Sequence, residues 1–138
     1  MLFKTSQNQK KIREELERIC GRQYTLIEKI KNGFYGSPKY LLKGMNPKDF
    51  DIDFEDYSDL AYCTMEMRTK GMAIYFRYKN EEYVLMSRYN QISFLSNDGI
   101  IETQSNNYIL KLKVTDNKGH QKFIKAFYES RNLFMKSY

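Results

Sequence analysis

Residues able to act as a nucleophile or a base are few in this chain. Its 138 residues include one histidine, His120, and two cysteines, Cys20 and Cys63. A thiol nucleophile needs a base beside it, so the pair to consider is Cys63 with His120. Cys63 belongs to an alternating apolar run that predicts a core-facing side chain, and His120 stands at the predicted start of a helix. We therefore expect a non-enzymatic protein that uses no cofactor.

A run of alternating carboxylates is the second feature that could do chemistry. The spacing of Asp49, Asp51 and Asp53 matches the start of an EF-hand calcium loop. That loop also needs glycine at its sixth position and glutamate at its twelfth. Phe54 and Leu60 occupy those positions, so the calcium pattern fails and we predict no metal site.

The same alternation predicts a strand that turns its carboxylates to one side. A solvated face that discourages pairing at a sheet edge is one explanation of such a row. Docking of a basic partner, or of the protein's own N-terminal segment, is the other. The predicted acidic docking face consists of Asp49, Asp51, Asp53 and Glu55.

Basic and aromatic residues of the central segment form the third candidate. The chain carries a net charge of +6, which permits an anionic partner without requiring one. Cations hold phosphate, and exposed rings beside them can stack nucleobases. Such residues also commonly decorate the solvent-facing side of a sheet. The predicted binding residues are Arg68, Lys70, Tyr75, Arg77, Lys79 and Arg88.

An N-terminal helical arm is predicted over residues 6–32, followed by a linker loop over 34–48. Apolar residues recur at three- and four-residue steps, which places them on one stripe. Gly21 offers a point at which the arm splits into two helices. The stripe must pack on the rest of the domain or on a second copy of the chain. Its members are Ile12, Leu16, Ile19, Cys20, Ile27 and Ile30.

From residue 49 the apolar period changes to two and predicts about seven short antiparallel strands. Turn residues separate them, including Lys70-Gly71 and Asn97-Asp98-Gly99. A helical period returns from His120 to the C-terminus. The expected fold is therefore α+β, with a small barrel or bent sheet and a C-terminal helix that caps its open end.

This order of elements resembles the pleckstrin-homology-like (PH-like) superfold over residues 50–138. Members of that family usually carry a tryptophan in the C-terminal helix, and this chain has none. Phosphoinositide-binding members have a basic cluster around the first hairpin. The resemblance implies that Arg68, Lys70, Arg77 and Lys79 stand nearest to that cluster. It implies a binding fold rather than a particular ligand.

Three segments follow from these patterns: a helical arm (1–33), a linker loop (34–48) and a PH-like β-barrel with its C-terminal helix (49–138). We expect a non-enzymatic binding or scaffolding domain that contacts a protein or self-associates as a homodimer through the N-terminal helix. Binding of anionic lipid or nucleic acid through a basic sheet face is the alternative. No apolar stretch approaches the roughly 18 residues of a membrane span. The separated cysteines favour a cytoplasmic protein with free thiols.

Overall fold

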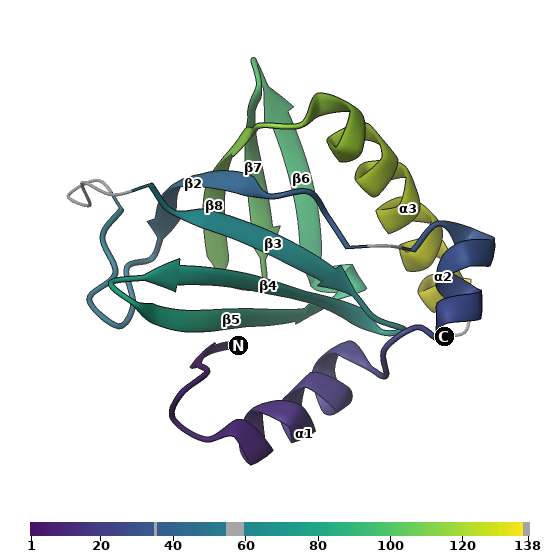
Figure 1. Ribbon diagram of the computed structural model, residues 1–138, viewed down its shortest axis with the longest axis horizontal. Helices are drawn as coiled ribbons and strands as arrows, with labels where there is room; N and C mark the ends of the chain where they lie inside the picture. Colours follow the sequence, from purple (N-terminus) through teal and green to yellow (C-terminus); the bar gives the residue numbers. More distant parts are fainter. Residues whose placement is uncertain (35, 55–59, 137–138) are drawn as a thin grey trace.

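The computed structural model describes residues 1–34, 36–54 and 60–136, and within them the fold is α+β, as predicted (Figure 1). The strands are β1 (Leu2–Lys4), β2 (Tyr40–Asn46), β3 (Tyr62–Met67), β4 (Gly71–Tyr78), β5 (Glu81–Arg88), β6 (Ile92–Asn97), β7 (Ile100–Ser105) and β8 (Tyr108–Val114). The helices are α1 (Gln9–Cys20), α2 (Leu26–Asn32) and α3 (Asn117–Lys136), and a short 3₁₀ turn, η1, spans Tyr89–Gln91.

All eight strands of the described residues belong to one antiparallel sheet in the order β1-β5-β4-β3-β2-β8-β7-β6. Two meanders, β2 to β5 and β6 to β8, are joined because β2 pairs with β8. The edge strands β1 and β6 do not pair with each other, so the sheet is bent but open rather than a closed barrel. At the bend, the hydroxyls of Ser87 on β5 and Ser105 on β7 form a hydrogen bond.

The main core lies between the concave side of this sheet and α3, which covers one end of it (Figure 1). Alternation along the strands turns every second side chain inward, so Met65, Ile74 and Leu85 face this core. From α3, Phe127 packs edge-on against Phe94, with the ring centroids 4.8 Å apart. Burial of such side chains, at about 25 cal/mol per Å² of apolar surface, provides the main stabilisation.

Helix α1 covers the opposite face of the sheet, at β4 and β5. Asn8 is its N-cap, and the Asn8 side chain accepts a hydrogen bond from the Lys11 amide. The arm therefore packs on its own domain over this part. The residues of this second, smaller core are Ile12, Leu16, Ile19, Cys20, Ala73, Val84 and Met86.

The predicted break at Gly21 is confirmed. Gly21 ends α1 with φ of 82° and ψ of −174°, a conformation that suits glycine. A Cβ at this position would stand 2.2 Å from Thr69 Oγ1 and 2.9 Å from the Lys70 nitrogen. After Gly21 the chain runs along residues 68–70, where Gln23 forms a β-bridge with Arg68, before α2 starts in a new direction (Figure 1).

The predicted linker over 34–48 is wrong at its centre, because residues 40–46 form β2. This strand joins the two meanders and buries Tyr40, Leu42 and Met45. Its register against β8 shifts between Leu42 and Gly44. Such a bulge adds one residue to the strand and breaks the period of two by which a strand is recognised.

A strand was predicted from residue 50, and the described part of that segment is a turn instead. Phe50 and Asp51 have φ of 53° and 59°, left-handed values that no strand accommodates. The Phe50 amide donates to the side chain of Asp49, a local hydrogen bond by which aspartate favours turns. Ile52 and Phe54 are nevertheless buried, as their alternation predicted.

No helix in the described ranges combines the length and the apolar character that crossing a bilayer would require.

Candidate functional site

The six predicted binding residues do not form one patch. Lys70 precedes β4 and Lys79 follows it, so eight strand residues separate them. At about 3.3 Å per residue, the nine steps from residue 70 to residue 79 place the two lysines about 30 Å apart. Arg68 and Arg88 lie at the Lys70 end, and Tyr75 and Arg77 lie toward the Lys79 end.

Residues at the first end bind the C-terminus of α1. The Arg68 guanidinium donates to the Gly21 carbonyl at 3.2 Å, and the Arg88 guanidinium donates to the Arg18 carbonyl at 3.2 Å. The Lys70 amide donates to the Cys20 carbonyl at 2.8 Å. The last carbonyls of a helix have no partner within the helix and carry its negative dipole end. The two arginine side chains and the backbone of Lys70 therefore hold the arm in place.

Residues at the second end line a pocket of about 510 Å³ on the outer face of the sheet. Tyr75 and Arg77 share this pocket with Lys39 and Tyr62. Burial raises the pKa of Tyr75 to about 12, so its hydroxyl is neutral at pH 7. Lys79 lies over the ring of its neighbour Tyr78, at 5.4 Å from the centroid. Of the six predicted binding residues, this pocket therefore brings together only Tyr75 and Arg77.

The predicted acidic docking face is not a row. Asp49 accepts a hydrogen bond from the Tyr108 hydroxyl, and Asp53 forms an ion pair with Lys48 at 3.0 Å. Asp51 is exposed within the turn. The left-handed turn aims neighbouring carboxylates in different directions, whereas a strand would have aligned them. Glu55 lies outside the described residues.

The candidate thiol pair is buried and arranged for packing. Burial raises the pKa of the Cys63 thiol to about 12, so at pH 7 it is neutral and a weak nucleophile. His120 Nδ1 forms a hydrogen bond with the Tyr40 hydroxyl at 2.7 Å, and burial lowers the pKa of this imidazole. Among the described residues, no group of three or more His, Cys, Asp or Glu side chains could hold a metal ion.

Helix α2 carries the feature that sequence reasoning missed. Three aliphatic residues of its seven are largely solvent-exposed: Leu26 at 69%, Ile27 at 76% and Ile30 at 64%. Large exposed aliphatic side chains that gather on one element mark interaction surfaces more often than isolated ones do. None of the residues of α2 is buried, so this helix contributes nothing to the core.

The structure nevertheless fixes α2 at both ends. Thr25 and Glu28 form a reciprocal capping box at its start, and Gly33 ends it with a left-handed conformation. The rings of Tyr24 and Phe34, which flank the helix, are both buried and lie 4.8 Å apart. An exposed helix of seven residues is unstable by itself, so these anchors supply its order. The Thr25-x-x-Glu28 spacing is the sequence signal that predicts this separate helix.

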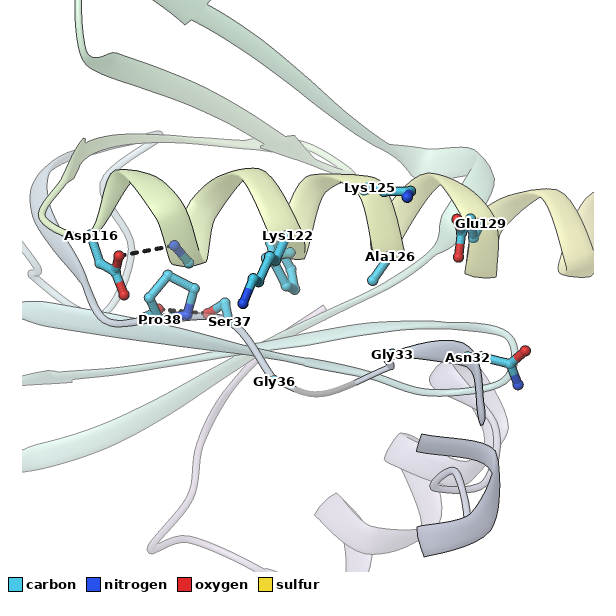
Figure 2. Close-up of a pocket in the computed structure, with 12 residues that line it drawn as sticks. Asn32, Gly33, Gly36, Ser37, Pro38, Asp116, Lys122, Lys125, Ala126 and Glu129 are labelled. Atoms are coloured by element: carbon cyan, nitrogen blue, oxygen red, sulfur yellow. Dashed lines mark hydrogen bonds between the residues drawn. The ribbon is translucent and has the colours of Figure 1, made fainter. Parts of the chain in front are cut away.

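A groove of about 590 Å³ begins at the C-terminal end of α2 and follows α3 (Figure 2). One wall consists of Asn32, Gly33, Gly36, Ser37 and Pro38, and Phe123 and Ala126 supply the apolar part of the other. It extends from Asp116, directly before α3, to Glu129 on that helix, which corresponds to about 20 Å.

Positive charge surrounds these two features. Lys29 and Lys31 lie on α2, and Lys122 and Lys125 line the groove. Figure 2 shows the Lys122 side chain pointing across the groove toward Ser37. Within residues 1–34, 36–54 and 60–136, none of these four ammonium groups forms an ion pair.

The acids nearby are mostly engaged. Glu28 pairs with Arg22 at 2.7 Å, and Asp116 accepts from the Gly119 amide to cap α3. We call the exposed face of α2 together with this groove the α2–α3 surface. No protein-family model matches the chain, and neither does any curated protein or solved structure.

Proposed function

We propose that this protein is a non-enzymatic binding module of PH-like type that docks on a macromolecule through the α2–α3 surface. The strand order supports the PH-like part of the proposal: two antiparallel meanders meet at β2 and β8, and a helix follows the last strand. The observation that carries the function is the fixed helix α2 with its aliphatic side chains in water. The two buried cysteines form no disulfide, which supports a location in the reducing cytoplasm.

The two parts of the arm explain why α2, rather than α1, is the proposed contact. The apolar stripe of α1 is buried against β4 and β5, so it is not available to a partner or to a second copy. The aliphatic side chains of α2 have no such cover. Any association through the arm, including a homodimer, would therefore use Leu26, Ile27 and Ile30.

A photoreactive amino acid placed at the position of Ile27 tests this proposal in cells that produce the protein naturally. We expect ultraviolet-dependent adducts, because a diazirine reacts with whatever protein or lipid covers the site. The matched control carries the same group at Gln104, an exposed position of β7. Equal adduct yields at the two positions would show that α2 is ordinary solvent-exposed surface.

The outer-face pocket supports a second candidate, the binding of nucleic acid. The specific observation is that Arg77 and Lys39 line this pocket beside the half-exposed Tyr62, which stands 43% exposed. A single-stranded oligonucleotide should bind with an affinity that falls as salt rises, since neutralised phosphates release counterions. Arg77→Gln should weaken binding, whereas Lys10→Gln, on the exposed side of α1, should not. Equal effects of both changes would remove this candidate.

A further inference from the structure

We propose that the partner of the α2–α3 surface is an anionic lipid bilayer, into whose interface α2 inserts its aliphatic side chains. This inference rests on the proposed function and names the partner. Three observations carry it: the exposed aliphatic side chains of α2, the lysines that surround them, and the anchoring of α2 before any partner arrives.

The aliphatic group has the composition of a shallow membrane contact. Leu26, Ile27 and Ile30 occupy one side of the seven-residue helix, because their spacing of one, three and four residues places them together. Interfacial helices bury such a side about 5–10 Å into the boundary between headgroups and acyl chains. Three side chains of this size can reach that depth without deforming the domain behind them.

The lysines provide the electrostatic complement. Lys29 and Lys31 flank the aliphatic residues, and their long stems allow the ammonium groups to reach headgroup phosphates while the stems lie along the apolar boundary. Lys122 and Lys125 extend the positive charge along the groove. Glu129, which also lines the groove, is the carboxylate of α3 that opposes them.

This combination favours a bilayer over a protein partner or a second copy. A stable protein interface covers about 800 Å² on each partner, with a broad apolar centre. Here the apolar centre is three side chains of one short helix, surrounded by unpaired ammonium groups. A second copy would bring the same lysines together in a chain whose net charge is already +6. A bilayer supplies an apolar layer and anionic phosphates at matching depths.

The anchors of α2 contribute because binding then requires no folding. Tyr24 is buried, and its hydroxyl bonds Ser130 on α3, while Phe34 is 2% exposed at the other end. Many interfacial helices become ordered only on the membrane and lose affinity through that ordering. A helix that is ordered in water avoids this loss, so a contact of three aliphatic side chains can suffice.

The test is co-sedimentation of the full chain with phosphatidylcholine vesicles, with and without about 30% phosphatidylglycerol. We expect binding only to the anionic vesicles, and release at about 0.5 M NaCl, where charge interactions are screened. The paired change Ile27→Asn with Ile30→Asn should weaken binding at least roughly tenfold, because it removes most of the inserted apolar surface. Lys29→Gln with Lys31→Gln should weaken it roughly 20-fold.

Matched controls come from exposed positions on the sheet, outside the α2–α3 surface. Leu95→Ser on β6 removes an aliphatic side chain that is 65% exposed, and Lys111→Gln with Lys113→Gln on β8 removes two exposed lysines. Both controls should bind vesicles within about twofold of the unchanged protein, because surface changes away from the contact have little effect. Circular dichroism checks that every variant is folded.

Two results would overturn the inference. Equal losses in the β8 and α2 lysine variants would show nonspecific adsorption of a basic protein, and absence of binding to anionic vesicles would exclude the bilayer. The photo-crosslinking experiment separates this failure from that of the proposed function. Adducts at Ile27 to a protein or to a second copy, without vesicle binding, would leave the binding function standing and remove the lipid.

Discussion

Helices α1 and α2 are neighbours in the chain, and both carry aliphatic side chains spaced for one face. In α1 those side chains pack under the helix against β4 and β5, and in α2 they project into water. The difference arises beyond Gly21, which ends α1, because the chain then runs along residues 68–70 before α2 starts. A buried stripe stabilises the fold, whereas an exposed stripe on an anchored helix is available to a partner.

The two helices are also held by different forces. Apolar burial and three hydrogen bonds to its C-terminal carbonyls hold α1 on the sheet. Caps, one ion pair and two flanking aromatic rings hold α2. Loss of a side chain should therefore destabilise the fold in α1 and leave it almost unchanged in α2.

The largest contrast is expected between Leu16→Ala and Ile27→Ala. Leu16 lies on the buried side of α1 and is 5% exposed, so its truncation leaves a cavity and should lower the free energy of unfolding by about 2–5 kcal/mol. Ile27 is 76% exposed, and its truncation should change that free energy by less than about 0.5 kcal/mol. Denaturant unfolding followed by circular dichroism measures both. Equal losses would mean that α2 is part of the core.

The break between the helices is tested by Gly21→Ala, with Gly33→Ala as its control. Both glycines have positive φ, but Gly33 is left-handed, where alanine costs about 1 kcal/mol, whereas Gly21, with ψ of −174°, adopts a conformation almost restricted to glycine. Only at Gly21 would the new Cβ also meet Thr69 and the Lys70 backbone. We expect Gly21→Ala to cost about 1–3 kcal/mol more than Gly33→Ala in the same unfolding experiment. Similar costs would show that neither the backbone conformation of Gly21 nor its close approach to residues 69–70 makes glycine necessary there.

The sequence predicted the elements whose apolar period is regular. The stripe of α1, the period of β4 and the apolar face of α3 all follow from spacing alone. Strand β2 was missed because its bulge interrupts the period, and residues 50–51 were predicted as strand because their left-handed conformation is not visible in an alternating pattern. Local pattern thus specifies regular elements and misses local irregularities.

The candidate site was harder to predict, because it depends on contacts between distant residues. The charges of Arg68 and Arg88 were visible, but their partners are carbonyls of α1 that only the folded chain brings near. Ile27 and Ile30 were recognised as part of an apolar stripe, yet spacing alone does not reveal whether a stripe is covered. The capping box at Thr25 and Glu28 marks a second helix start and was the available clue.

Thiol reactivity gives an independent view of α1. Cys20 is the last residue of this helix and is fully buried against the sheet. Burial raises the pKa of its thiol to about 12, so labelling with a thiol reagent at pH 8 must proceed through opening of the structure. Cys63 is buried in the main core, with a pKa also raised to about 12. Lifting α1 alone should expose Cys20, so we expect it to react roughly tenfold faster than Cys63.

Single-thiol variants, Cys63→Ser and Cys20→Ser, allow the two rates to be measured separately with a thiol-reactive dye. Leu16→Ala should accelerate labelling of Cys20 more than labelling of Cys63, because it weakens the attachment of α1. Identical rates for the two thiols would indicate that α1 and the main core open as one cooperative unit.

The smallest expected effect is on the order of α2 at low pH. The Arg22 guanidinium, and then the Thr25 amide, lower the pKa of Glu28 to about 2 from a usual 4.5. Because the folded value is the lower one, the contribution of Glu28 is complete above about pH 4.5 and is lost as pH falls toward 2. Amide hydrogen exchange in α2 should therefore lose protection over this window, relative to its intrinsic rate. Helix α1, whose cap is the uncharged Asn8, should not show the same loss. Glu28→Gln should remove the pH dependence in α2, and its persistence there would assign the effect to another carboxyl group.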